Sequence, residues 1–67
     1  MNKSFEKKKI GDLVFCISHR FPYILFGKVS DIFDDTFFVR FFKTKIVNFW
    51  KRSGKNVSLN VKYVLIK

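Results

Sequence analysis

The densest run of strand-forming residues lies at positions 36–43, where large apolar side chains follow one another with a period of two. At this period the two faces of the strand consist of Phe37, Val39 and Phe41 on one side, and Phe38, Arg40 and Phe42 on the other. The first face is wholly apolar and is expected to face the core. The second face places an arginine between two phenylalanines, so it is either a second buried face or an exposed aromatic and basic surface.

Four further segments have the length and composition of strands. An apolar run at 13–17 follows a turn signal at Gly11-Asp12, within a strand region over 10–18. Residues 26–33 lead through the predicted Asp34-Asp35 turn into 36–43 as a hairpin, and strands are also expected at 46–52 and within 57–67. Without any helical periodicity, this pattern predicts an all-β fold, a small five-stranded barrel that curls to bury its aromatic residues.

The chain of 67 residues is long enough for one domain, with a thin stability margin. We expect residues 1–9, which hold four lysines, to form a basic N-terminal arm, and residues 10–67 to form the barrel. Most large apolar side chains are needed in the core of so small a domain. An aromatic residue assigned to function must therefore be surplus to that core.

Fourteen basic and five acidic residues give a net charge of +9, which favours a polyanionic partner. The alternative explanation of the positive charge is a genome rich in A/T, whose codon bias would raise the lysine content. Phenylalanine, isoleucine, lysine and asparagine supply 31 of the 67 residues, and all four have A/T-rich codons. Only three of the basic residues are arginine, the preferred bidentate reader of phosphate and guanine.

The sequence contains no reaction signature. The single cysteine, Cys16, is expected to be a buried small hydrophobe in a reducing compartment, and no His/Cys cluster suggests a metal site. No nucleophile is accompanied by a base, and the Asp34-Asp35 pair is explained by a turn. We therefore expect a cytoplasmic protein that is not an enzyme and uses no cofactor, metal, small-molecule substrate or membrane.

The segment 19–25 contains the only histidine and the only proline, and it reads as a structured loop between strands. Arg20 and Tyr23 combine a charge and a ring at this loop, where recognition residues are often found. The alternative is that its aromatic rings, Phe21 and Tyr23, cap one end of the barrel.

Three short motifs carry a resemblance to a known fold. Lys-Ile-Gly-Asp-Leu-Val at 9–14, Gly-Lys-Val at 27–29 and Phe-Val-Arg-Phe-Phe at 38–42 resemble the pattern of SH3-like barrels of the KOW, Tudor and chromo-barrel kind. The similarity covers most of residues 9–50. It implies either a KOW-like module that binds RNA, DNA or the transcription and translation machinery, or a Tudor-like aromatic cage for a methylated lysine or arginine.

A cage would be built from Phe21, Tyr23, Phe38 and Trp50, but the positive charge of this chain disfavours a cationic ligand. Our first hypothesis is therefore a non-enzymatic nucleic-acid-binding module. Its expected site consists of phosphate contacts and stacking rings: Arg20, Tyr23, Lys28, Phe38, Arg40, Phe42, Lys43, Lys45, Trp50, Lys51, Arg52 and Lys55. The second hypothesis is a protein-interaction module that binds and modulates an acidic host protein, as would suit a viral or mobile-element product.

Overall fold

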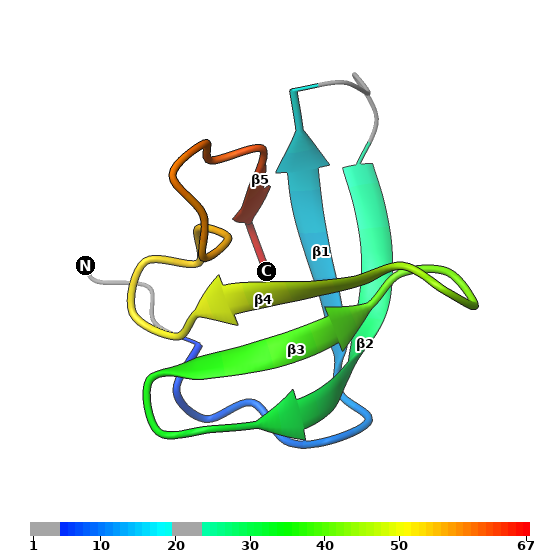
Figure 1. Ribbon diagram of the computed structural model, residues 1–67. Helices are drawn as coiled ribbons and strands as arrows, with labels where there is room; N and C mark the ends of the chain where they lie inside the picture. Colours follow the sequence, from blue (N-terminus) through cyan, green and yellow to red (C-terminus); the bar gives the residue numbers. More distant parts are fainter. Residues whose placement is uncertain (1–4, 20–23) are drawn as a thin grey trace.

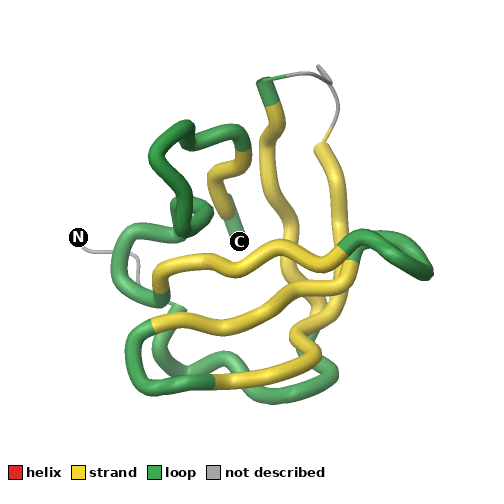
Figure 2. Tube along the Cα trace, in the orientation of Figure 1, coloured by secondary structure: helices red, strands yellow, loops and turns green. Residues whose placement is uncertain are grey.

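The computed structural model describes residues 5–19 and 24–67. Within this part of the chain there are five strands and no helix (Figures 1 and 2). The strands are β1 (Leu13–Ser18), β2 (Ile24–Ile32), β3 (Thr36–Arg40), β4 (Ile46–Trp50) and β5 (Tyr63–Leu65). They form one antiparallel sheet in the order β4-β3-β2-β1-β5. The prediction of an all-β, five-stranded fold is confirmed, and the sheet curls into a half-barrel.

Strand β2 makes the sheet curl because its two halves pair with different neighbours. From Ile24 to Lys28 it pairs with β1, and from Lys28 to Ile32 it pairs with β3. The register shifts between Val29 and Asp31, which marks a β-bulge that bends the strand. As a result, β3 and β4 run across the direction of β1 (Figure 1).

The segment 54–57 closes the gap between the two ends of the sheet. On one side it bonds to β4, where the Trp50 amide donates to the Lys55 carbonyl at 2.9 Å. On the other side it bonds to β5, where the Leu65 amide donates to the Gly54 carbonyl at 2.7 Å. These bonds satisfy backbone groups that an open sheet would leave at its edges.

The core lies on the inner face of the curled sheet. The side chains of Phe37 and Phe49 are fully buried and meet edge to face, with ring centroids 6.5 Å apart. The other buried apolar side chains are Phe5, Val14, Cys16, Val29, Val39, Tyr63 and Leu65. The apolar face predicted for residues 36–43 is therefore correct, since Phe41 also packs against this cluster.

Several predicted boundaries differ from the observed ones. Strand β3 ends at Arg40 rather than at residue 43, because the Phe41 amide turns to donate to the Lys45 carbonyl at 2.9 Å. Strand β4 ends at Trp50, where a turn begins with the Gly54 amide donating to the Trp50 carbonyl at 2.9 Å. The last strand is reduced to residues 63–65.

The segment predicted as a basic arm contributes to the core. Phe5 is only 6 % exposed, and its amide donates to the Lys51 carbonyl at 2.7 Å. Its ring fits against Gly54, where an added Cβ would lie 2.6 Å from the Phe5 Cε2 atom. The packed part of the molecule thus includes Phe5, because burial of a large apolar ring is more favourable than its exposure to water.

Candidate nucleic-acid interface

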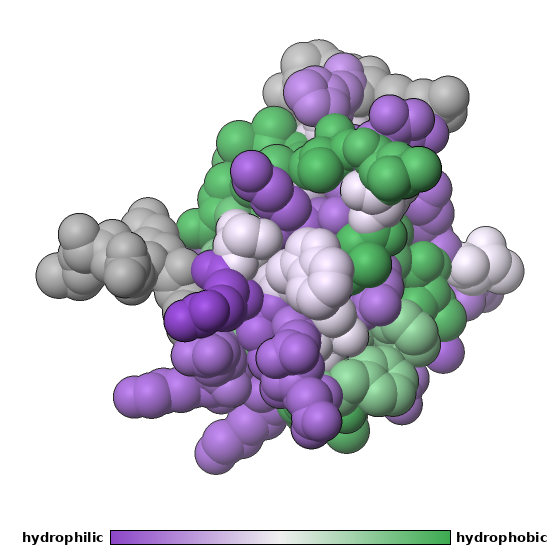
Figure 3. Space-filling model, turned by 60° about the vertical axis from the view of Figure 1, so that its left-hand side comes forward, coloured by the Kyte–Doolittle hydropathy of each residue, from purple (hydrophilic) through white to green (hydrophobic). Residues whose placement is uncertain are grey.

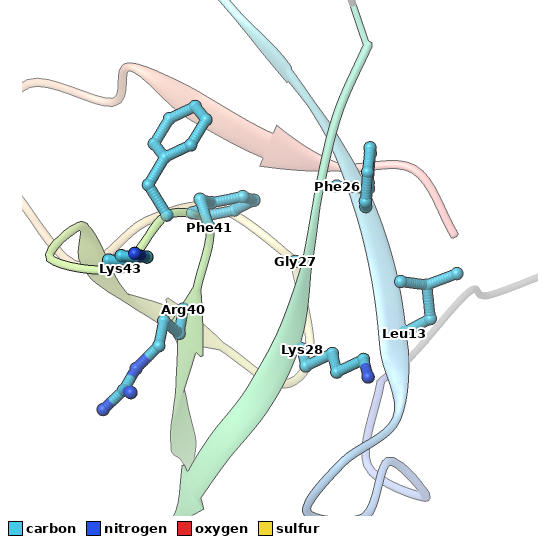
Figure 4. A pocket seen from close by; sticks show the side chains of 8 residues that line it. Leu13, Phe26, Gly27, Lys28, Arg40, Phe41 and Lys43 are labelled. Atoms are coloured by element: carbon cyan, nitrogen blue, oxygen red, sulfur yellow. The ribbon is translucent and has the colours of Figure 1, made fainter.

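A groove with a volume of about 410 Å³ opens where β1, β2 and the end of β3 meet (Figure 4). We call it the cationic groove. It is lined by Leu13, Phe26, Gly27, Lys28, Arg40, Phe41, Phe42 and Lys43. In Figure 4, Leu13 and Phe26 lie on one side of the β2 backbone at Gly27, and Arg40, Phe41 and Lys43 lie on the other.

The register of the sheet sets the position of the cations. Lys28 pairs with Leu13 on β1 and with Arg40 on β3, so it lies where the three strands meet. Directly opposite residues of antiparallel strands have Cβ atoms about 5 Å apart, and like charges at such positions repel each other. Figure 4 shows the two side chains extending in different directions from this point.

The positive charge of the groove is not neutralised by any carboxylate that lines it. Lys43 adds a third cation to Lys28 and Arg40, and the residues that line the groove include no carboxylate. Three cations on one small surface create a positive potential that a phosphate backbone can neutralise.

Aromatic rings stand beside these cations. Phe26 is 63 % exposed and Phe42 is 62 % exposed, so neither ring contributes substantially to the core. Phe41 between the two walls is half-buried and is held by the core, since it stacks on Tyr63 at 6.2 Å and meets Phe49 edge to face at 6.0 Å. The groove therefore combines a fixed inner ring with two solvent-exposed ones.

Four of the residues predicted for the site are brought together here: Lys28, Arg40, Phe42 and Lys43. The face formed by Phe38, Arg40 and Phe42, which the sequence left as either buried or exposed, is partly exposed. Arg40 is exposed, whereas Phe38 is half-buried and meets Phe33 edge to face at 5.1 Å. Phe38 is therefore covered by a neighbouring ring.

The other predicted residues in the described part of the chain do not line the groove. Trp50, 43 % exposed, and Arg52 line a separate hollow of about 340 Å³ together with Asp35 and Ser53. Lys45 places its Nζ atom 5.4 Å from the centre of the Tyr63 ring, a cation–π contact. Lys51 is half-buried and Lys55 is exposed, and both belong to the connection after β4. Arg20 and Tyr23 lie outside the described residues.

Four residues of the groove were missed by the sequence prediction: Leu13, Phe26, Gly27 and Phe41. The signal was present for Phe26, because a period of two puts it on the same face of β2 as Lys28. For Leu13 the apolar run at 13–17 gave no indication of which side chains would remain in contact with solvent.

The outward side of β1 and β2 forms a second notable surface, which we call the outer apolar face: Leu13, Phe15, Ile17, Ile24 and Phe26. Ile17 is 50 % exposed and Ile24 is 59 % exposed, although they lie directly opposite each other on paired strands. Two of these five, Leu13 and Phe26, also line the cationic groove, and Lys28 lies directly opposite Leu13 at the edge of this face. A large exposed apolar patch of this kind is typical of an interaction surface.

Hydrophilic side chains gather on a part of the surface rather than covering it evenly. In Figure 3 they crowd the lower left of the face shown, while hydrophobic side chains lie along its upper part and its right side. The face shown is thus divided into polar and apolar regions.

Cys16 takes no part in either surface. Its side chain is fully buried in β1, as predicted. Burial raises the pKa of the Cys16 thiol to about 11, so the thiol is protonated and unreactive near neutral pH. Among residues 5–19 and 24–67, no three His, Cys, Asp or Glu side chains converge to hold a metal, and no helix has the length and apolarity needed to cross a membrane.

Comparison with known proteins identified no relative. No protein-family model matches the chain, and no match was found among curated proteins or solved structures.

Proposed function

We propose that the protein is a small, non-enzymatic nucleic-acid-binding module that holds the sugar-phosphate backbone in its cationic groove. One observation carries this proposal: Lys28 lies directly opposite Arg40, Lys43 is beside them, and no carboxylate lines the same groove. Two strands gain nothing in stability from paired like charges. Although the Lys28 and Arg40 side chains extend apart (Figure 4), the groove holds three cations and no carboxylate, and a ligand that supplies negative charge would neutralise them.

We also propose that the half-barrel is an SH3-like barrel of the KOW or Tudor kind. The positions of the three sequence motifs support this assignment. The Gly11-Asp12 turn directly precedes β1, Gly27-Lys28-Val29 lies inside β2, and the motif at 38–42 begins inside β3 and continues past its end at Arg40. Of the two functions that the resemblance implies, the three cations of the groove favour the KOW-like one, since a methylated lysine or arginine is itself cationic.

The test of nucleic-acid binding is a salt titration of the affinity for a fluorescent oligonucleotide, measured by anisotropy. If three phosphates are neutralised, the slope of log K against log salt should be about −2 for a single strand and about −3 for a duplex. The K28Q/R40Q variant should bind more weakly and lose roughly 1.5 to 2 units of that slope.

The matched control is K9Q/K62Q, which removes the same charge from two exposed lysines outside the groove. It should retain most of the affinity and slope. A salt-independent affinity, or an equal loss in both double variants, would refute the proposal. Far-UV circular dichroism verifies that each variant is folded.

A second candidate function is protein interaction, which the outer apolar face specifically favours. Its partner would present an apolar surface edged by carboxylates, because the cation of Lys28 borders the outer apolar face on β2 and the chain carries a net charge of +9. Binding through this face should persist at high salt, whereas binding through the cationic groove should not.

A further inference from the structure

The exposed rings of the cationic groove point to a specific class of nucleic acid. Resting on the proposed function, we infer that the groove binds single-stranded nucleic acid by stacking unpaired bases on Phe26 and Phe42 while Lys28, Arg40 and Lys43 hold the adjacent phosphates. The sequence alone indicated Phe42 as a stacking ring but gave no role to Phe26.

The two rings of the groove are unusually exposed for phenylalanine side chains in this domain. Phe26 and Phe42 are each more than 60 % exposed, in a domain that buries Phe5, Phe37 and Phe49 almost completely. Exposed phenylalanine rings are unfavourable in water, and the flat face of a base is a surface that would cover them.

The exposed rings and the cations lie together in one groove. Phe26 is two residues from Lys28 along the same face of β2, and Phe42 directly precedes Lys43. Phe42 thus has a cation next to it in sequence, Phe26 has one two residues along the same strand face, and Arg40 lies in the same groove. In a single strand, bases and phosphates likewise alternate along the chain, so rings and cations can bind them at the same time.

Two competing ligands, a nucleic-acid duplex and a cationic group in an aromatic cage, do not fit this combination of rings and charges. In a duplex, the base faces are stacked on one another inside the helix, where protein rings cannot reach them without unstacking. A cationic ligand in an aromatic cage would be repelled by three positive charges at the same rings. Unpaired bases are the class of ligand that uses both the rings and the cations.

The experiment compares three probes of the same length: an oligothymidine 12-mer, an abasic 12-mer with the same number of phosphates, and a 12-base-pair duplex. Wild type should bind oligothymidine at least tenfold more tightly than the abasic strand, and also more tightly than the duplex at equal salt. The F26L and F42L variants, which keep an apolar side chain but lose the ring face, should each weaken oligothymidine binding about tenfold. Neither should change abasic binding.

The control variant is F33L, because Phe33 is a 50 % exposed ring outside the groove. It should bind all three probes like wild type. Equal wild-type affinity for oligothymidine and the abasic strand, or unchanged oligothymidine binding by folded F26L and F42L, would overturn the inference. In those cases salt-dependent binding to the phosphates would still support the proposed function, whereas salt-independent binding or none to any probe would refute both. The wild-type comparison needs no variant to fold.

Discussion

At Gly27 the backbones of β2 and β3 approach each other closely. A Cβ atom at this position would lie 2.5 Å from the Arg40 carbonyl oxygen and 3.0 Å from Cδ1 of Phe41. The Arg40 carbonyl group belongs to the backbone and cannot move without displacing the end of β3. The absence of a side chain at Gly27 therefore allows Arg40 and Phe41 to reach the groove.

We expect Gly27→Ala to lower the free energy of unfolding by about 1–3 kcal/mol, because the added methyl group overpacks a backbone contact. Urea denaturation followed by circular dichroism measures this change. The control is Ser30→Ala in the same strand. The Ser30 hydroxyl is buried without a hydrogen-bond partner among the described residues, so its removal should be neutral or stabilising. Equal destabilisation by both substitutions would contradict this account.

At the level of elements, Asn56 connects the segment after β4 to the start of β5. Its Oδ1 atom accepts hydrogen bonds from the Lys62 amide at 2.7 Å and from the Tyr63 amide at 2.9 Å, and the residue is only 7 % exposed. One side chain thus satisfies two backbone donors where the segment 54–57 meets the start of β5.

Asn56→Ala should destabilise the protein by about 2 kcal/mol or more, because amide donors that are partly or fully buried would lose their acceptor. Asn60→Ala is the matched control, since Asn60 is exposed in the same connection and should change stability by less than about 0.5 kcal/mol. Thermal and urea unfolding of both variants provide the measurement. If Asn56→Ala were as stable as Asn60→Ala, the prediction would be wrong, and the contact between the segment 54–57 and β5 would depend on interactions other than the Asn56 side chain.

The elements themselves were largely predictable because short strands with turn signals carry local information. The Asp34-Asp35 turn is one example, where the Phe33 amide donates to the Thr36 carbonyl at 2.9 Å. The pairing of Lys28 with Arg40 was not predictable, because the bulge between Val29 and Asp31 changes the register of the strands. The role of Phe5 was equally hidden, since its burial depends on the space beside Gly54, far along the chain.

The site was predicted only in part for a similar reason. Charge and aromatic content pointed to Arg40, Phe42 and Lys43, which follow one another closely in sequence. Trp50 and Arg52 were assigned to the same site, but the fold places them in a different hollow with Asp35. Composition identifies candidate residues, while their grouping depends on the curvature that β2 imposes on the sheet.

At the scale of the whole molecule, the net charge of +9 and the outer apolar face favour different partners. Because cations predominate throughout the chain, they repel one another in the folded state. Added salt should weaken this repulsion, since the screening length falls from about 30 Å at 0.01 M to about 10 Å at 0.1 M.

We therefore expect sodium chloride to have opposite effects on the fold and on its complex with nucleic acid. Raising the salt from about 20 mM to about 200 mM should increase the thermal midpoint of the free protein by a few degrees, because self-repulsion is screened. The same change should weaken oligonucleotide binding roughly 100-fold if three phosphates of a single strand are neutralised, since the slope of log K against log salt is then near −2 over a tenfold change in salt. A ligand held by the outer apolar face would instead remain bound over this range. Parallel melting and anisotropy measurements on one preparation would therefore distinguish the two surfaces, and an oligonucleotide complex that tightens with salt would assign the ligand to the apolar one.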